Sequence, residues 1–270
     1  MLCPTSECRM SQTYNDLLDF DVTGADPCVN LAGSGPTYEP DGTAVANPCW
    51  QIVNDGLVPG SEDRRALVEE EIFLEHFNTN YTASWYLVRS AVSLDSSGNL
   101  AKHTPSCESS SLSRNSTLGP LTLNTVDASK SCPSSFIPLM GCGRRSAELT
   151  GKIGLNEGGT PLSMSFTPGP VLNPEMTTPS FAQGTSRVGP SGWWATWDKS
   201  TLQDYRGFAP VHKGACNILF ADGSVRSFLD TNEDGLLNNG FEPTEENGFA
   251  DAELELNPKE FASSWKLKCK

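Results

Sequence analysis

Residues 212–241 read HKGACNILFADGSVRSFLDTNEDGLLNNGF, and this stretch predicts more about the fold than any other part of the chain. An apolar, β-prone run over residues 217–221 leads into Asp222-Gly223, a dipeptide that tolerates the positive φ angles of a tight hairpin turn. Residues 224–229 then alternate small or polar side chains with apolar ones. The pattern therefore predicts two antiparallel strands joined by a short turn.

Oxygen-bearing side chains follow the hairpin at the spacing of a calcium-binding loop. Asp230, Asn232 and Asp234 occupy positions one, three and five, and Gly235 occupies position six, where an EF-hand-type loop turns sharply. Position twelve carries Phe241 instead of a bidentate Glu. We therefore expect Ca²⁺ to be bound by the side chains of Asp230, Asn232 and Asp234, the backbone carbonyl of Leu236, and an oxygen of Asn238 or Glu242. The alternative is a plain turn rich in Asp, Asn and Gly.

The composition favours many turns and short strands in one globular domain. Gly and Pro number 24 and 19 among 270 residues, and they are spread along the whole chain. The formal net charge of −14 argues against nucleic acid or an anionic membrane as a partner, because both would repel the protein. We expect a single α+β, strand-dominated domain over residues 1–270, with a hairpin and calcium-loop subregion at 212–242.

One main helix is predicted, from Ser61 to about residue 77, because apolar residues recur there at helical spacing and Glu62-Asp63 favour a helix N-terminus. Residues 80–92 predict a strand. Two stretches rich in Ser, Gly and Pro, 93–117 and 156–192, predict long surface loops, and within the second, residues 166–171 have strand-like patterning. The final stretch, 253–268, alternates apolar and charged residues and predicts a last strand or a short turn.

Nine cysteines without close CxxC pairs favour disulfides over a zinc ribbon, and hence an exported protein outside the cell or at the cell surface. Three loops bounded by cysteines could each be closed by a bridge: Cys3–Cys8, Cys28–Cys49 and Cys107–Cys132. Because the count is odd, at least one thiol is free or paired between chains. Cys216 and Cys269 are the candidates, and Cys216 is best interpreted as a small buried residue within its strand.

Sequence motifs of enzymes are missing, so we expect a protein that is not an enzyme. None of the three histidines has zinc-ligand spacing, and no nucleophile elbow, phosphate loop or dinucleotide fingerprint occurs. His212 is expected to make a hydrogen bond that ties the preceding loop to the sheet. The aromatic cluster of Trp193, Trp194, Trp197 and Tyr205 could stack on a glycan, but a place in the core or an interface is the favoured interpretation.

Nine residues separate His212 from Asp222 and Gly223, and the stretch VHKGACNILFADGSVRSF resembles the C-terminal signature of the prepilin-type H-x9-DG domain. That family has no known biochemical activity and is grouped with type II secretion pseudopilins. Further similar pieces are LCPTSEC, NTNYTASWYLVRS, STLGPLTLN, FIPLMGCG and TLQDYRGFAPVH. The resemblance implies a pilin-like globular domain that builds a homo-oligomer, a filament or another extracellular assembly.

Members of that family normally begin with a prepilin cleavage site and a long apolar helix, which this sequence does not show. No stretch approaches the roughly 18–20 apolar residues of a membrane span. We therefore expect any assembly to use the globular surface, with Ca²⁺ making the loop rigid. The alternative is a secreted, calcium-dependent carbohydrate-binding module that uses the tryptophan-rich segment.

Overall fold

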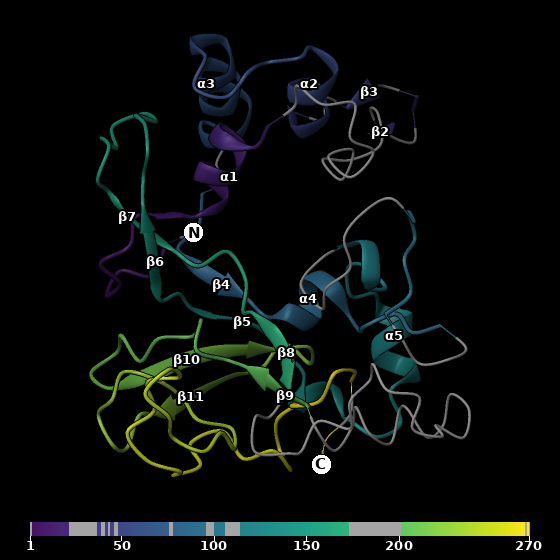
Figure 1. Cartoon of the computed structure of the whole chain (residues 1–270), viewed down its shortest axis with the longest axis vertical. Coiled ribbons are helices and arrows are strands. Elements are labelled where there is room, and N and C mark those ends of the chain that lie inside the picture. Colours follow the sequence, from purple (N-terminus) through teal and green to yellow (C-terminus); the bar gives the residue numbers. More distant parts are fainter. Residues whose placement is uncertain are drawn as a thin grey trace. The chain divides into compact units, whose positions relative to one another are not determined.

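The computed structural model describes residues 2–21, 37–38, 41–42, 44–45, 48–75, 78–95, 100–105, 114–172, 201–267 and 269. Helices and strands both occur among them, which confirms the predicted mixed α+β fold (Figure 1). The chain gathers into two compact units. Unit 1 comprises Met1–Asn80, Thr104–Cys107 and Arg145–Ser165, and unit 2 comprises Tyr81–His103, Glu108–Arg144 and Phe166–Lys270. That residues 1–270 form one domain stays a prediction.

Unit 1 combines short helices with a small sheet of strand order β1-β7-β6. Met10, Leu17, Val68 and Leu162 belong to the buried cluster that joins these elements, and Met10 pairs with Leu162 across the parallel strands β1 and β7. Since the strands contain only two to four residues, packing of helix side chains supplies most of this core. The elements are β1 (Met10–Ser11), α1 (Thr13–Asp19), β2 (Thr37–Tyr38), β3 (Ala44–Val45), α2 (Pro48–Asn54), α3 (Glu62–Val68), β6 (Arg145–Glu148) and β7 (Pro161–Ser163).

The predicted main helix is present in unit 1 and begins where the sequence places it. Ser61 caps α3, because its hydroxyl oxygen accepts a hydrogen bond from the Arg64 backbone N–H. A five-residue π-helix, Glu69–Phe73, continues α3, so the helical run ends a few residues before the predicted end near 77. Val68 is fully buried and lies in the core of unit 1, as the apolar spacing predicts.

Unit 2 is organised around a four-stranded sheet of order β11-β10-β5-β4, in which all neighbours are antiparallel (Figure 1). A second pair of strands, β8 and β9, is also antiparallel. The elements are β4 (Tyr81–Ala83), α4 (Trp85–Arg89), α5 (Leu123–Ala128), β5 (Pro138–Cys142), β8 (Gly169–Leu172), β9 (Thr201–Asp204), β10 (Ala215–Phe220) and β11 (Val225–Leu229), with 3₁₀ turns at Arg114–Ser116 and Ser134–Phe136. Strand β8 overlaps residues 166–171, where the sequence predicts a strand, whereas β7 of unit 1 lies in a part of 156–192 that the sequence predicts to be a loop.

The predicted strand at 80–92 is wrong beyond its first residues. Strand β4 ends at Ala83, and the Ser84 hydroxyl then accepts a hydrogen bond from the Leu87 N–H and caps α4. The short helix places Trp85 and Tyr86 side by side in the core, where both are fully buried. A capping serine and the burial of two large rings therefore outweigh the strand propensity of the apolar residues.

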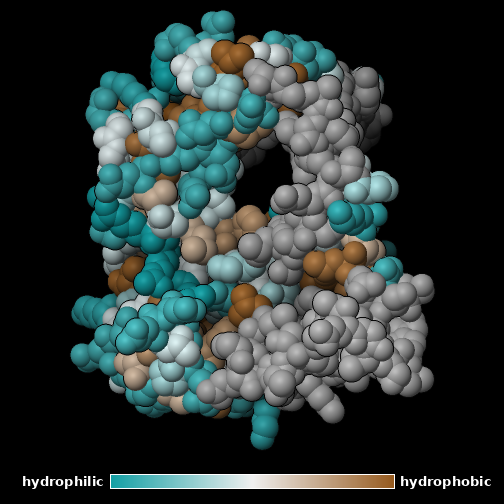
Figure 2. Space-filling model, viewed as in Figure 1, coloured by the Kyte–Doolittle hydropathy of each residue, from teal (hydrophilic) through white to brown (hydrophobic). Residues whose placement is uncertain are grey.

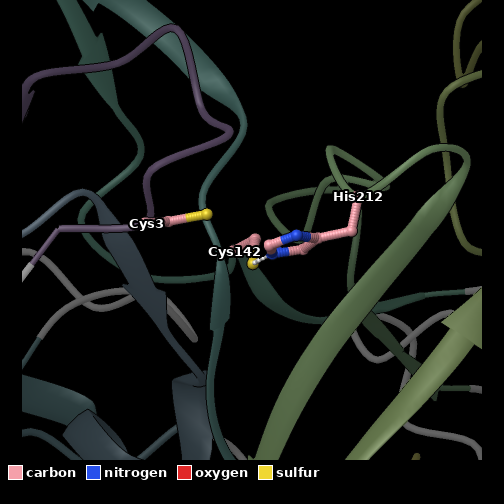
Figure 3. A group of neighbouring side chains, drawn as sticks. All are labelled: Cys3, Cys142 and His212. Carbon is pink, nitrogen blue, oxygen red and sulfur yellow. Dashed lines mark hydrogen bonds between the residues drawn. The ribbon is translucent and has the colours of Figure 1, made fainter.

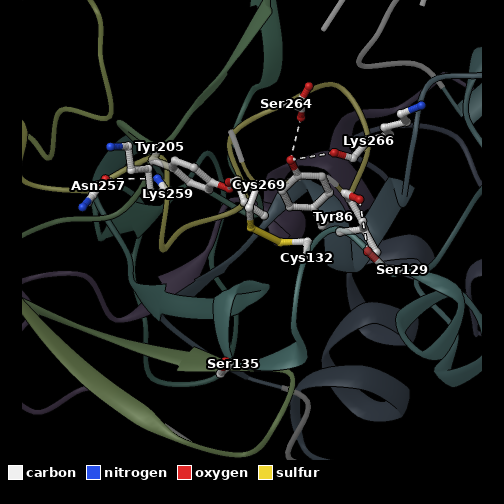
Figure 4. Close-up of a disulfide and its surroundings, with 12 residues drawn as sticks. Tyr86, Ser129, Cys132, Ser135, Tyr205, Asn257, Lys259, Ser264, Lys266 and Cys269 are labelled. Carbon is white, nitrogen blue, oxygen red and sulfur yellow. Dashed lines mark hydrogen bonds between the residues drawn. A yellow bond between two sulfur atoms is a disulfide. The ribbon is translucent and has the colours of Figure 1, made fainter.

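The C-terminal segment of unit 2 contains turns and no strand over residues 253–267, and it is tied down by side chains and by a disulfide. Phe261 and Trp265 are buried, and the Ala262 N–H donates to the Phe136 carbonyl at 2.8 Å. The hydroxyl of Tyr86 donates to the Ser264 carbonyl at 2.5 Å (Figure 4). The C-terminal segment is thus held by contacts that are distant in sequence.

The disulfide seen in the structure does not join any of the cysteine pairs that bound a loop in the sequence. Cys132 and Cys269 form a disulfide with their Cα atoms 5.0 Å apart (Figure 4), so the possible Cys107–Cys132 bridge does not form and Cys269 is not the cysteine left free or paired between chains. Cys8 is a thiol, and the small Cys3–Cys8 loop is therefore not closed. Cys28, Cys107 and the side chain of Cys49 lie outside the described residues. Closeness in the sequence did not identify the partner of Cys132, because folding brings two cysteines that are 137 positions apart into contact.

The described part of the face seen in Figure 2 is mainly polar. Figure 2 shows that hydrophilic residues predominate on the described part of the visible face, with hydrophobic residues interspersed. Among the described residues, no helix has the length and apolar character that crossing a membrane requires.

Candidate functional site: the signature hairpin and the calcium loop

Strands β10 and β11 form the predicted hairpin, and Asp222 and Gly223 form its turn. Five residue pairs, from Ala215 with Leu229 to Leu219 with Val225, define an antiparallel register. Oδ1 of Asp222 accepts hydrogen bonds from the N–H and the hydroxyl of Ser224, at 2.9 and 2.7 Å. Gly223 has φ of +83°, a conformation that a residue with a Cβ rarely adopts. The signature dipeptide is therefore used to close the turn.

His212 lies at the other end of the hairpin and fastens it to the sheet. Its backbone N–H donates to the Ala215 carbonyl at 2.9 Å, and its ring Nε2 lies 3.1 Å from Sγ of Cys142 on β5 (Figure 3). This confirms the predicted hydrogen bond between the loop before the hairpin and the sheet. His212 and Asp222 stand at opposite ends of β10, so they do not form an acid–base pair.

Cys216 on β10 is fully buried, as the sequence predicts for a small residue within an apolar strand. The side chain of Cys142 on the neighbouring strand, followed by burial, raises the pKa of Cys216 well above its ordinary value. A thiol that stays protonated is a poor nucleophile. We therefore assign Cys216 a packing role.

The loop after β11 is organised around the two predicted aspartates. Asp230, only 9 % exposed, accepts hydrogen bonds from the N–H groups of Asp234 and Gly235, the latter at 2.8 Å. Asp234 accepts bonds from Leu236 and from Ala250, both at 2.8 Å. Gly235 has φ of +81°, which makes the sharp turn expected at position six. The aspartates thus face into the loop backbone.

The remaining predicted ligands differ in their surroundings. Asn232 also faces inward, since its Oδ1 accepts from the Asp234 N–H at 3.2 Å. Leu236 packs in a buried cluster with Leu202. Oδ1 of the fully buried Asn238 already accepts two backbone N–H groups, at 2.9 and 2.8 Å, and Glu242 is exposed.

Glu255 is a carboxylate of this loop that the sequence does not point to. One of its oxygens accepts a hydrogen bond from the Thr231 N–H at 2.9 Å, and the other accepts from the Asn238 N–H at 2.8 Å. Burial raises the pKa of Glu255, and the negative charges of Asp230 and Asp234 raise it further. Glu255 therefore supplies a third carboxylate near the two aspartates, although it lies far beyond them in the sequence.

The three carboxylates of Asp230, Asp234 and Glu255 are near one another, but their oxygen atoms do not surround a common point. Among the described residues, no three carboxylates of this loop bring one oxygen each within 4.8 Å of the others. Their oxygens are instead occupied by loop amides. A divalent cation would draw the carboxylates inward by side-chain movements and would offset the repulsion that raises the pKa of Glu255.

The aromatic candidates for glycan stacking, Trp193, Trp194 and Trp197, lie outside the described residues. Tyr205, which follows them in the sequence, is buried against Phe208 and Phe261, and its hydroxyl donates to the Ala262 carbonyl. The core interpretation is therefore confirmed for Tyr205.

The fold and the hairpin define a mixed α+β protein whose most distinctive element is a four-stranded antiparallel sheet. Residues 81–235, more than half of the chain, match the model of a family described as a protein of unknown function, DUF1559. The chain belongs to this family. The matched region contains all four strands of the sheet and ends at Gly235, within the loop that follows β11. No curated protein and no solved structure matches the chain.

Proposed function

We propose that the chain is an exported, pilin- or pseudopilin-like structural subunit of an extracellular or cell-surface filament or assembly, and that it is not an enzyme. The observation that carries this proposal is how the signature residues are used. His212 fastens the hairpin to β5, and Asp222 and Gly223 close its turn, so the polar atoms of the motif hold the sheet together. A motif whose polar atoms stabilise the sheet is typical of a structural protein.

Calcium has a structural role in this proposal. Asp230, Asn232 and Asp234 would bind the ion with the Leu236 carbonyl, and we add Glu255 as the carboxylate that takes the place of the missing glutamate at position twelve. The loop begins directly at the end of β11, because the Asp230 N–H still donates to the Gly214 carbonyl at 2.8 Å. An ion bound there would fix the end of the hairpin as well as the loop.

The proposal predicts that the native protein assembles. Electron microscopy and light scattering of the purified chain, with Ca²⁺ and with EDTA, should show filaments or a defined oligomer in Ca²⁺. The chelated sample should show fewer or smaller assemblies, because the loop is less ordered without the ion. A monomer at every concentration tested, in both buffers, would overturn the structural-subunit proposal.

The pH dependence of stability should differ between the two buffers. Because the pKa of Glu255 is raised by folding, the charged form destabilises the ion-free protein. The melting temperature in EDTA should therefore fall as pH rises from the ordinary value of 4.5 to the raised pKa of folded Glu255. In Ca²⁺ this fall should disappear, since the ion neutralises the carboxylates.

Thermal melts across this pH range provide the test, with Glu255→Gln as the matched variant. That variant should lose both the fall in EDTA and most of the stabilisation by Ca²⁺. Parallel pH curves in the two buffers would contradict the assignment of Glu255 to the site.

A further inference from the structure

Strand β11 forms an open edge of the four-stranded sheet in unit 2. It has β10 on one side and no strand of the described chain on the other (Figure 1). The Asp230 N–H donates to the Gly214 carbonyl, and the Ser224 carbonyl accepts from the Phe220 N–H. The backbone N–H and carbonyl groups of the even-numbered residues of β11 therefore point toward β10. Hydrogen bonding alternates along an antiparallel strand, and the backbone groups of Val225, Ser227 and Leu229 therefore point outward.

The same three residues expose their side chains. Val225 is 64 % exposed, Leu229 is 61 % exposed, and Ser227 is also exposed. The single charged residue of β11, Arg226, does not guard the edge, because its guanidinium lies 3.7 Å from the centre of the Phe220 ring and donates to the Ser135 carbonyl. Edge strands of soluble proteins are commonly protected by Lys or Pro, and neither occurs in β11.

We propose that β11 pairs with β11 of a second copy of this chain, antiparallel and centred on Ser227. This inference rests on the proposed structural role and names the surface through which one contact of the assembly forms. In this register Val225 lies opposite Leu229 of the second copy, and Ser227 lies opposite its own counterpart. All three are outward-facing positions, so every outward amide finds a carbonyl.

The side-chain pattern is complementary to itself in this register. Within one copy, Leu219 pairs with Val225, Asn217 with Ser227, and Ala215 with Leu229. Pairing of two copies would join these cross-strand pairs into three rows of side chains that run across both hairpins. The middle row, which contains Ser227, is polar, and the rows on either side of it are apolar. Apolar residues directly opposite each other stabilise a sheet, and a polar row between them fixes the register.

The charges near the ends of β11 also fit a second copy. Asp230 would lie opposite Ser224 and Asp222 opposite Asn232, so no carboxylate faces another across the contact. The contact is small, because the Val and Leu side chains cover only a few hundred Å², whereas standard interfaces bury roughly 1,200–2,000 Å². The pair should therefore be weak by itself, and a contact with two-fold symmetry closes on itself, so a filament needs another contact elsewhere.

A register-specific cross-link tests the proposal in the full chain. Ser227→Cys places two thiols directly opposite each other, at about the 5.5 Å Cα separation that a disulfide accepts. Mild oxidation with oxidised glutathione should give a covalent dimer on a non-reducing gel. In the control Leu229→Cys, each new thiol lies four residues from its counterpart, about 13 Å away, and should give little dimer. The parent chain, oxidised in parallel, measures the background from its own thiols.

A second variant tests the hydrogen bonds without a new thiol. Ser227→Pro removes an outward N–H that β10 does not use, and it should weaken self-association in sedimentation experiments by at least about tenfold. Ser227→Thr keeps the N–H and should associate like the parent.

The outcomes separate this proposal from the structural role on which it rests. Equal cross-linking of the Ser227→Cys and Leu229→Cys variants, or none in either, would overturn the β11 contact, and so would unchanged association of Ser227→Pro. If assemblies are still seen by microscopy in that case, the structural role stands and the contact lies elsewhere. Cross-linking at position 227 without any larger assembly would support the β11 contact and remove the filament from the proposed function.

Discussion

Removing Ca²⁺ with EDTA should lower the melting temperature of this protein by about 5–10 °C. A ligand present at a hundredfold excess over its dissociation constant stabilises the folded state by about 2.7 kcal/mol, and each kcal/mol shifts the melting temperature of a chain of this size by roughly 2–4 °C. The physical source is the cluster of Asp230, Asp234 and Glu255, whose mutual repulsion adds to burial in raising the pKa of Glu255. An ion would replace that repulsion by attraction.

Matched variants identify the ligands. Asp230→Ala should abolish the difference between Ca²⁺ and EDTA, whereas the exposed Glu242 should be dispensable, so that Glu242→Gln keeps the full difference. The opposite result, loss in Glu242→Gln and retention in Glu255→Gln, would restore the ligand predicted from the sequence. An unchanged melting temperature of the parent protein in EDTA would contradict calcium binding in this loop.

Breaking the disulfide should cost about 2–5 kcal/mol of unfolding free energy. Cys132 and Cys269 are 137 residues apart, so the bridge greatly restricts the unfolded chain. The bridge also holds the C-terminal segment that carries Phe261 and Trp265 into the core. Denaturant unfolding of Cys269→Ser and of the reduced parent should show the same lowered midpoint.

Treating the Cys269→Ser variant with dithiothreitol provides the control. This variant already lacks the Cys132–Cys269 bridge, so cleavage of that bridge cannot contribute to any shift of its unfolding midpoint. Counting thiols in the unfolded chain before and after reduction shows whether the bridge was present at the start. If the parent gains at least two thiols on reduction and its midpoint does not move, the Cys132–Cys269 disulfide does not stabilise the fold.

Local features of the sequence were sufficient to predict several structural elements. The Asp222-Gly223 turn, the alternating pattern after it and the helix start at Ser61 depend on residues that are neighbours in the chain. The inward orientation of Asp230, Asn232 and Asp234 follows from the same local spacing. The turn, the helix cap and the orientation of the loop side chains agree with the structure because all of them depend on short-range interactions.

Other features were decided by tertiary contacts. The stretch 80–92 has the composition of a strand, yet burial of Trp85 and Tyr86 turns its second half into a helix. The partner of Cys132 is Cys269 because the C-terminal segment returns to the core, and the same return brings Glu255 to the loop that follows β11.

The sequence by itself thus determined the hairpin, its Asp222-Gly223 turn and the inward orientation of Asp230, Asn232 and Asp234 in the loop that follows it. Only the tertiary structure decided which carboxylate stands near Asp230 and Asp234, which cysteines are bridged, and that β11 is left as an open edge. The physical reason is chain distance, because the identity of a residue says little about which segment, far away in the chain, packs against it.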